Sequence, residues 1–269
     1  MEVHAHTHPS TGSGHRKKWT HYFWEFLMLF LAVFCGFLAE NQREHMIEHQ
    51  RAKAYAQSLY KDLQNDTADI RKAAVYENRI VSTIDSLVSF INSPDLSQKG
   101  GILYYYMRIG CWRYDVDWNK ATIDQLISSG NLRYFTNTTL VTLISNYNTL
   151  SNMITRQDDG ISEKRNRAVV YRDRIAIAKY EQAYSSITMA DIFSGSKIAY
   201  IDSLRSINML IQSNAVDLLN AFANALLDTK ANRYNLGTKY YPKAIELATE
   251  IMELLKKEYH LSEGTPLEN

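Results

Sequence analysis

The stretch YFWEFLMLFLAVFCGFLA, residues 22–39, decides the architecture of this chain. Glu25 is its only charged residue, and a helix formed by it would have no polar face. A helix that crosses a bilayer needs about 20 mostly apolar residues, with a lower limit near 17. Trp19, Tyr22 and Trp24 stand at its N-terminal edge, where aromatic rings favour the headgroup region. We therefore predict a transmembrane helix over residues 19–40. The alternative is a buried core helix of a soluble protein.

The sequence around this segment gives no signal for its removal. Cleavage after Ala39 would place Phe37 where a signal peptidase requires a small residue. Val33 and Phe34 occupy the small-residue positions before Cys35 that a lipoprotein signal would need. We therefore predict an uncleaved signal-anchor.

The charges on either side of the segment differ. Arg16, Lys17 and Lys18 precede it, whereas ENQRE, residues 40–44, follows it. The positive-inside rule then places the N-terminus in the cytoplasm and the rest of the chain on the other side of the membrane. Arg51 and Lys53 follow soon afterwards and make this bias modest.

The small residues Ala32, Gly36 and Ala39 share one face of the predicted span. Small residues on one face allow two membrane helices to approach closely, so self-association of the chain is a hypothesis.

The composition is that of an ordinary folded protein. Of 269 residues, 45% are hydrophobic and 22% charged, which excludes a disordered chain. The formal net charge of +1 provides no general attraction to nucleic acid, and we expect no nucleic-acid partner. Only 4 Pro and 11 Gly are present, which favours long helices. Cys35 lies in the apolar segment, so we expect Cys111 to be a buried, unbridged thiol.

An all-α fold follows from the apolar spacing, because no stretch alternates as strands do. Neither Gly nor Pro occurs between Gly36 and Pro94, so the membrane helix is predicted to continue as a stalk and then lead to an extracytoplasmic helical bundle. Within the stalk, QNDT at 64–67 offers a possible helix break. The predicted organisation is a disordered His-rich tail at 1–18, the membrane helix at 19–40, the stalk or long helix at 41–92, the bundle at 93–262 and a disordered C-terminus at 263–269.

Within the bundle, residues 93–101 are predicted to form a loop and residues 194–196 a turn. Asp117 is predicted to be the N-cap of the helix that ends before Gly130. Gly130 suits the left-handed position after that helix. The other predicted helices cover residues 102–113, 138–158, 161–192, 197–232 and 240–259.

The sharpest chemical motif is His45-Met-Ile-Glu48-His49, which fits the inverted zinc-protease pattern HxxEH. Two histidines one turn apart can ligate zinc beside a glutamate base, but no third ligand stands out. The competing interpretation is a solvated juxtamembrane segment. His4, His6 and His8 form a second, weaker metal candidate in the N-terminal tail. We predict no resident cofactor and no enzyme activity.

Two other groups of residues could bind something. The basic residues between 164 and 179 fall on more than one helical face, which is typical of a solvated surface; the alternative is an anionic ligand or lipid headgroups. Tyr104, Tyr105 and Tyr106, with Trp112 and Trp118, are best interpreted as core aromatics, although residues 104–118 would be the first place to look for a pocket. The basic residues between 164 and 179 are Lys164, Arg165, Arg167, Arg172, Arg174 and Lys179.

Two stretches carry a resemblance. MEVHAHTH followed by KKWTHYFWEFLMLFLAVFCGFLAENQREH resembles the N-terminal signature of an uncharacterised family of membrane-anchored proteins from Bacteroidetes-type bacteria. TIDQLISSGNLRYFTN, residues 122–137, is similar to a second stretch of that family. The resemblance implies a single-pass protein of a Gram-negative inner membrane with a periplasmic domain. It implies no activity and no site residues.

The favoured function is therefore a membrane-anchored interaction or scaffold protein, whose partners are the lipid bilayer and another protein or a second copy. The alternatives are a ligand-sensing helical domain that acts through a partner and, more remotely, a zinc metalloprotease.

Overall fold

The computed structural model describes residues 15–212 and 215–261, and its elements in this part of the chain are all helical. The predicted all-α fold is therefore confirmed there. The chain divides into two units, Met1–Ala54 and Tyr55–Asn269. The elements are α1 (His15–Ile91), η1 (Pro94–Ser97), α2 (Gly100–Gly110), α3 (Ala121–Ser128), η2 (Asn131–Tyr134), α4 (Thr138–Ile175), α5 (Ala178–Ser185), α6 (Met189–Ser194), α7 (Ile198–Ser206), α8 (Val216–Asn235), η3 (Leu236–Tyr240) and α9 (Tyr241–Tyr259).

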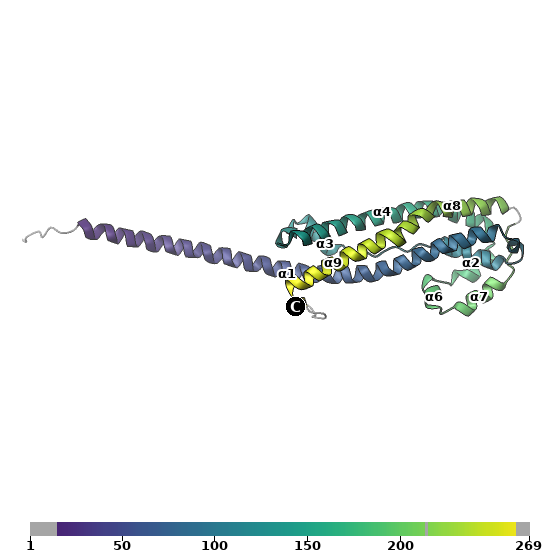
Figure 1. Ribbon diagram of the computed structural model, residues 1–269, viewed down its shortest axis with the longest axis horizontal. Coiled ribbons are helices and arrows are strands. Elements are labelled where there is room, and N and C mark those ends of the chain that lie inside the picture. Colours follow the sequence, from purple (N-terminus) through teal and green to yellow (C-terminus); the bar gives the residue numbers. More distant parts are fainter. Residues whose placement is uncertain (1–14, 213–214, 262–269) are drawn as a thin grey trace, which may run out of the picture. The chain divides into compact units, whose positions relative to one another are not determined.

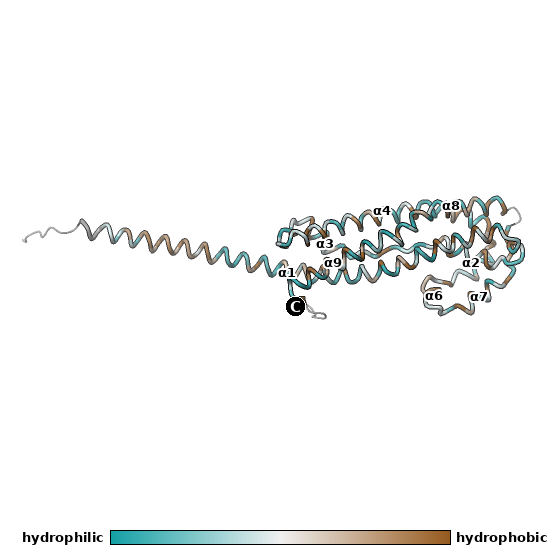
Figure 2. The backbone as a smooth tube through the Cα atoms, in the orientation of Figure 1, coloured by the Kyte–Doolittle hydropathy of each residue, from teal (hydrophilic) through white to brown (hydrophobic). Residues whose placement is uncertain are grey.

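The first unit contains the beginning of α1 and its apolar segment. Among the described residues this is the one helix that is long and apolar enough to cross a membrane. Its large apolar side chains are exposed, from 42% at Leu31 to 78% at Trp19. Figure 2 shows this stretch of α1 as a band of hydrophobic residues. A core helix of a soluble protein would bury such side chains, so the segment has the properties of a membrane span.

The second unit is built on three long helical rods: the part of α1 from Tyr55 onward, α4, and the continuous run α8–η3–α9 (Figure 1). The α4 helix is parallel to α1, as the hydrogen bond from the Tyr147 hydroxyl to Asp66 and the nearby placement of Glu77 and Asp158 indicate. The third rod is antiparallel to α1, because Lys230 pairs with Asp85 while Arg233 pairs with Glu77. These rods provide the frame on which the short helices pack.

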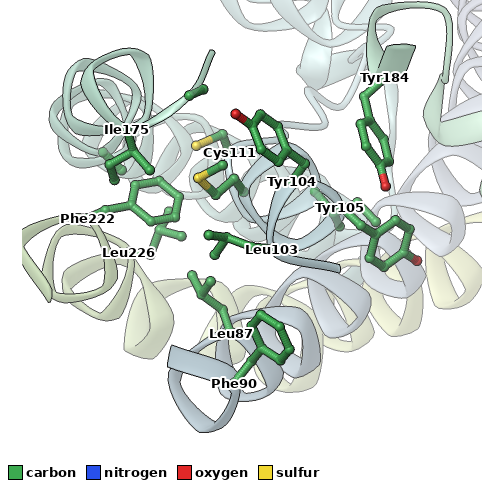
Figure 3. Packing of buried hydrophobic residues seen from close by; sticks show 14 of the residues in the cluster. Leu87, Phe90, Leu103, Tyr104, Tyr105, Cys111, Ile175, Tyr184, Phe222 and Leu226 are labelled. Carbon is green, nitrogen blue, oxygen red and sulfur yellow. The ribbon is translucent and has the colours of Figure 1, made fainter. Parts of the chain in front are cut away.

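Buried apolar side chains from several elements form a core beside α2. Figure 3 shows Leu87 of α1, Leu103 of α2, Ile175 of α4 and Phe222 of α8 gathered in this cluster. Tyr104 lies within it, and its hydroxyl donates a hydrogen bond to the carbonyl oxygen of Leu210 at 2.9 Å. The α2 helix is thus enclosed, which explains its largely apolar sequence.

The bundle begins earlier than the sequence suggests. Residues predicted as a stalk at 41–92 include the α1 segment from Tyr55, whose Leu59, Leu63 and Ile70 are completely buried. The predicted break at 64–67 is wrong, since α1 continues through these residues. Asp66 is buried there and accepts hydrogen bonds from other parts of the fold, so its polarity does not require a helix end.

Other boundaries differ for local reasons. The predicted loop 93–101 contains η1, and α2 begins within it at Gly100. The α4 helix runs from Thr138 through Gly160 to Ile175, so the predicted division near residue 160 is wrong. The predicted helix 161–192 is divided among α4, α5 and α6. The predicted helix 197–232 is divided between α7 and α8. A single sequence does not reveal these interruptions, since tertiary packing decides where helices end.

The predicted cap and turns have mixed outcomes. Asp117 is not an N-cap: α3 begins at Ala121 after Lys120, and the Asp117 amide instead donates to Asp69. Gly130 and Gly195 have φ of 68° and 70°, which confirms the left-handed position at the end of α3 and the turn at 194–196. Glycine adopts this conformation without the steric cost that a Cβ would bring.

The start of α2 depends on two glycines. A Cβ on Gly100 would lie 1.7 Å from the carbonyl oxygen of Met209, and a Cβ on Gly101 would lie 2.1 Å from that of Leu204. The Gly101 amide also donates to the Ile207 carbonyl at 2.9 Å. The backbone of α2 therefore touches the backbone of α7 and the segment after it, a contact that only glycine permits.

We predict that Gly100→Ala lowers the free energy of unfolding by about 3 kcal/mol or more, because backbone atoms must move to admit the methyl group. The matched control is Gly160→Ala in the middle of α4, where a Cβ would meet nothing within 4 Å. That change should raise stability by roughly 0.5–1 kcal/mol through helix propensity. Thermal unfolding of both variants checks the pair, and equal effects would contradict the proposed contact.

Candidate functional site

A layer of charged and polar side chains crosses the middle of the second unit. In α1, Glu77 lies between the buried residues Ala73 and Ile80, and in α4, Asp158 lies between Ile154 and Ile161. In the third rod, Arg233 lies three residues before the buried Leu236. Each rod therefore places a charge on its core-facing side at the same level. We call Glu77, Asp158, Arg233 and Tyr241, together with Arg113 and Asp115, the polar layer.

The centre of the polar layer is the ion pair between Glu77 and Arg233. The Arg233 Nη1 atom lies 3.1 Å and 2.8 Å from the two Glu77 carboxylate oxygens. The Arg233 side chain is fully buried and that of Glu77 nearly so. Burial raises the pKa of Glu77, while the charge and hydrogen bonds of Arg233 oppose that rise. The pair links α1 to α8 and satisfies charges that would otherwise be costly to bury.

Arginines also satisfy the C-terminal end of α2. Arg233 Nη2 donates to the carbonyl oxygen of Trp112 at 3.0 Å, and Arg165 Nε donates to that of Cys111 at 2.6 Å. Carbonyl groups at a helix end lack intrahelical partners and carry the negative end of the helix dipole, so cations stabilise them. The pair with Glu77 thereby fixes α2 as well as the rods.

Asp158 is the third carboxylate of the polar layer. Its surroundings raise its pKa to about 7, first through burial and then through the negative charges of Glu77 and Asp115. Arg113 and Arg233 act in the opposite direction, but each already pairs with another carboxylate, Asp115 and Glu77 respectively. Within the described residues no hydrogen bond or ion pair to Asp158 is present. The Asp158 side chain is partly exposed, so water as well as these charged groups surrounds its carboxylate.

Tyr241 contributes a fully buried hydroxyl to this layer. In the part of the chain that the structure describes, this hydroxyl has no hydrogen-bond partner. Burial raises its pKa, followed by the charges of Asp158 and Glu77, so it stays protonated. A buried hydroxyl without a hydrogen-bond partner costs about 1–3 kcal/mol. Tyr241 is therefore an unsatisfied polar group inside the layer.

A π-helical turn, η3, lies between Arg233 and Tyr241 in the third rod. Such turns widen the helix by one residue and are frequent at functional sites. Gly237 within it approaches α1 so closely that a Cβ would lie 2.7 Å from the Asn78 side-chain oxygen. The widened turn thus lies where the third rod meets α1, directly beside the polar layer.

A second group of carboxylates on α1 holds the segment that follows α2. Asp66 accepts hydrogen bonds from the Asn119 amide at 2.8 Å and from the Tyr147 hydroxyl at 2.7 Å. Asp62 accepts one from the Thr122 hydroxyl at 2.5 Å. Asp69 accepts hydrogen bonds from the Asp117 amide and the Tyr114 hydroxyl. These contacts fix residues 114–122 along α1, which keeps Arg113 and Asp115 in place.

The residues of the HxxEH motif lie on the first unit's part of α1. His45 and His49 are exposed, and His45 Nδ1 lies 4.0 Å from a Glu48 oxygen. The described residues contain no group of three His, Cys, Asp or Glu arranged to hold a metal ion. The other metal candidates, His4, His6 and His8, lie outside the described residues.

Of the basic residues predicted to form a solvated surface, Arg167 is exposed as expected, whereas Lys164 and Arg165 are partly buried and contact other elements. Arg165 holds the end of α2, Lys164 donates to Asn232 at 3.4 Å, and Arg167 pairs with Asp228 at 3.1 Å. These contacts join α4 to α8.

The predicted aromatic region 104–118 is mostly core. Tyr104 and Tyr105 are buried in the α2 cluster, and Cys111 is buried as expected. Burial raises the pKa of the Cys111 thiol to about 11, so it is a weak nucleophile at neutral pH.

Sequence reasoning missed the polar layer, although a signal for it exists. Glu77 falls on the same helical stripe as Ile70, Ala73, Ile80 and Ile84, all of which are buried. Asp158 and Arg233 likewise occupy apolar positions of their helices. A charge at a core position of an amphipathic helix indicates a buried partner, but it does not identify that partner.

We predict that Arg233→Met lowers the free energy of unfolding by about 3–5 kcal/mol, because it leaves the Glu77 charge buried without a partner. The matched control is Lys230→Met, one turn earlier on α8, which removes an exposed pair with Asp85 at 2.5 Å. Exposed pairs contribute roughly 0–1 kcal/mol, so the control should be nearly neutral. Adding Glu77→Leu to Arg233→Met should recover part of the loss. Denaturant unfolding measures all three, and an unchanged Arg233→Met protein would contradict the role of the pair.

Comparison with known proteins returns no relative: no family model, no curated protein and no solved structure matches this chain. The polar layer and the apolar segment therefore have to be interpreted from their own geometry.

Proposed function

We propose that this chain is a membrane-anchored helical interaction protein, whose C-terminal domain binds another protein or a second copy outside the cytoplasmic membrane. The observation that carries the proposal is the continuity of α1. One helix, His15–Ile91, contains both the exposed apolar segment and a rod of the folded domain. The anchor is thus joined to the domain by regular helix, an arrangement suited to holding a binding domain close to a membrane.

The distribution of exposed apolar side chains supports a binding role for the domain. Large exposed apolar side chains are concentrated between residues 193 and 216, whereas the remaining ones of this unit are spread over α1, α3, α4 and α8. Ile198, Leu210 and Val216 are each at least 60% exposed. Scattered exposed apolar residues are ordinary, and their concentration in one stretch of the sequence makes that stretch our candidate for a contact region. The residues concerned are Phe193, Ile198, Tyr200, Ile207, Leu210 and Val216.

A sensing domain that acts through a partner is the second candidate, and the polar layer favours it. The Tyr241 hydroxyl is buried without a hydrogen-bond partner among the described residues, and a widened helical turn precedes it. In this second candidate function the domain acts through a partner protein.

We predict that a photo-crosslinking amino acid at Leu210 or Ile198 of the full chain captures a protein in native membranes. The same amino acid at Val170, a 60% exposed position of α4, is the matched control and should capture little. Leu210→Ser should reduce the captured product by about fivefold or more, because apolar anchors dominate interfaces. Mass spectrometry identifies the product, and adducts of two copies would indicate self-association. Equal capture from all three positions, or none, would contradict a binding surface at 193–216.

We also predict that alkaline phosphatase fused after residue 261 is active, because that enzyme folds only when exported. Replacing Arg16, Lys17 and Lys18 with Glu should lower this activity, since positive residues before the span hold the N-terminus inside. The control replaces Arg51 and Lys53, which lie beyond the span, and should leave the activity high. An inactive fusion to the unchanged chain would overturn the proposed orientation.

A further inference from the structure

The α9 helix lies outside the hydrophobic cluster that surrounds α2. In α1 the buried members of this cluster begin at Ile80, after Glu77, and in α8 they end at Leu226, before Arg233. Among the described residues, none from α9 belongs to the cluster. The Glu77–Arg233 pair therefore marks the edge of the cluster on both rods, and α9 makes a separate contact with α4. The buried residues of α9 are Tyr241, Ala244, Leu247, Ala248, Ile251, Leu255 and Tyr259.

The α8 helix is fastened by polar contacts of its own. Arg233 binds the Glu77 carboxylate of α1 and the Trp112 carbonyl oxygen at the end of α2. The side-chain amide of Asn232 donates to that of Gln157 on α4 at 2.8 Å. All these contacts lie before η3 in the chain, so a displacement of α9 would break none of them.

The η3 turn between α8 and α9 is the weakest part of the third rod. Gly237 lies within η3 and Pro242 follows it at the start of α9, and these are the two least favourable residue types in a helix interior. Pro242 has no amide hydrogen, so the helical ladder loses one hydrogen bond at this point. The Tyr241 amide bonds the carbonyl oxygen of Leu236, five residues earlier. Prolines and π turns are the usual places where a long helix bends.

The two ends of α9 are held differently. At its start, the buried Tyr241 hydroxyl has no hydrogen-bond partner among the described residues, and water would supply one if this end moved away. At its far end, Glu258 accepts a hydrogen bond from Asn137, the N-cap of α4. The rings of Tyr259 and Phe135 meet edge to face there, with their centroids 5.8 Å apart. The helix thus begins at a weak joint and is fastened to the start of α4 at its other end.

We propose that η3 is a hinge about which α9 opens from α4 as one unit, while α8 and the cluster around α2 stay folded. Proteins open locally in cooperative units whose boundaries follow the packing, and the edge of the cluster and the weak joint coincide here. In the open form the apolar face of α9 becomes accessible. The hinge lies within the folded domain and does not depend on which partner residues 193–216 bind.

Amide hydrogen exchange of the full chain in detergent micelles tests the hinge without any substitution. A detached helix of this length keeps little protection in water. After correction for intrinsic exchange, peptides covering 244–255 should therefore exchange about tenfold faster or more than peptides covering 222–233 of α8, and uniformly along α9. Equal protection of α8 and α9 would overturn the hinge. Protection that declines steadily toward residue 259 would overturn it too, because that pattern is fraying of a helix end.

Pro242→Ala should slow the exchange of α9 by about fivefold or more relative to α8, because alanine restores the missing amide donor and favours helix. The matched control is Pro94→Ala, which replaces an exposed proline at the start of η1 and should leave the difference between α8 and α9 as it is. An unchanged difference in Pro242→Ala would contradict a joint at this position.

A covalent link at the far end of α9 tests whether the helix moves as one unit. In Cys35→Ala/Asn137→Cys/Glu258→Cys, a short bis-maleimide joins α9 to the start of α4, and a monofunctional maleimide on the same variant is the matched control. The link should slow exchange of residues 244–248 by about fivefold or more, although they lie at the opposite end of α9. Slowing confined to the residues beside the link would overturn opening as one unit. These measurements involve no partner, so their outcome is separate from capture at 193–216.

Discussion

The ion pair between Glu77 and Arg233 is the interaction on which the rest of the domain depends. It joins two rods at a fully buried position, and the same guanidinium group also satisfies the end of α2 through the Trp112 carbonyl. Burying two charges is costly, and their attraction repays that cost only when geometry is good and the remaining hydrogen bonds are satisfied. Arg233 meets this requirement with Glu77, Thr229 and Trp112 as partners. An apolar pair could give equal stability, but it would not fix the mutual alignment of α1 and α8 in the same way.

That alignment explains features that are otherwise unrelated. With Glu77 level with Arg233, the widened turn η3 comes next to Asn78, whose side-chain oxygen would lie 2.7 Å from a Cβ at Gly237. Tyr241 is then turned into the layer, and Asp158 of α4 meets a site in which the positive charges are already in use. The polar layer is therefore more than a stabilising contact. It also raises the pKa of one carboxyl group, that of Asp158.

The proposed binding region and the polar layer occupy different parts of the chain. Binding is assigned to the exposed apolar residues between 193 and 216, and the Glu77–Arg233 pair lies in the interior of the three rods. Both belong to a domain that shares a helix with the apolar segment near the N-terminus. The HxxEH residues, which are mostly exposed on the first part of α1, have no place in this scheme.

The sequence by itself determined the apolar segment, the helical class, the left-handed Gly130, the turn at 194–196 and the burial of Cys111. These depend on local composition, periodicity and backbone sterics, which a short window of residues contains. Where α4 ends, why α1 passes through residues 64–67, and which charges meet in the polar layer were decided only by the tertiary structure. Glu77, Asp158 and Arg233 are far apart in the chain, and nothing in the neighbourhood of one identifies the others. Their chemistry arises from desolvation and mutual charge, which exist only once the three rods have packed.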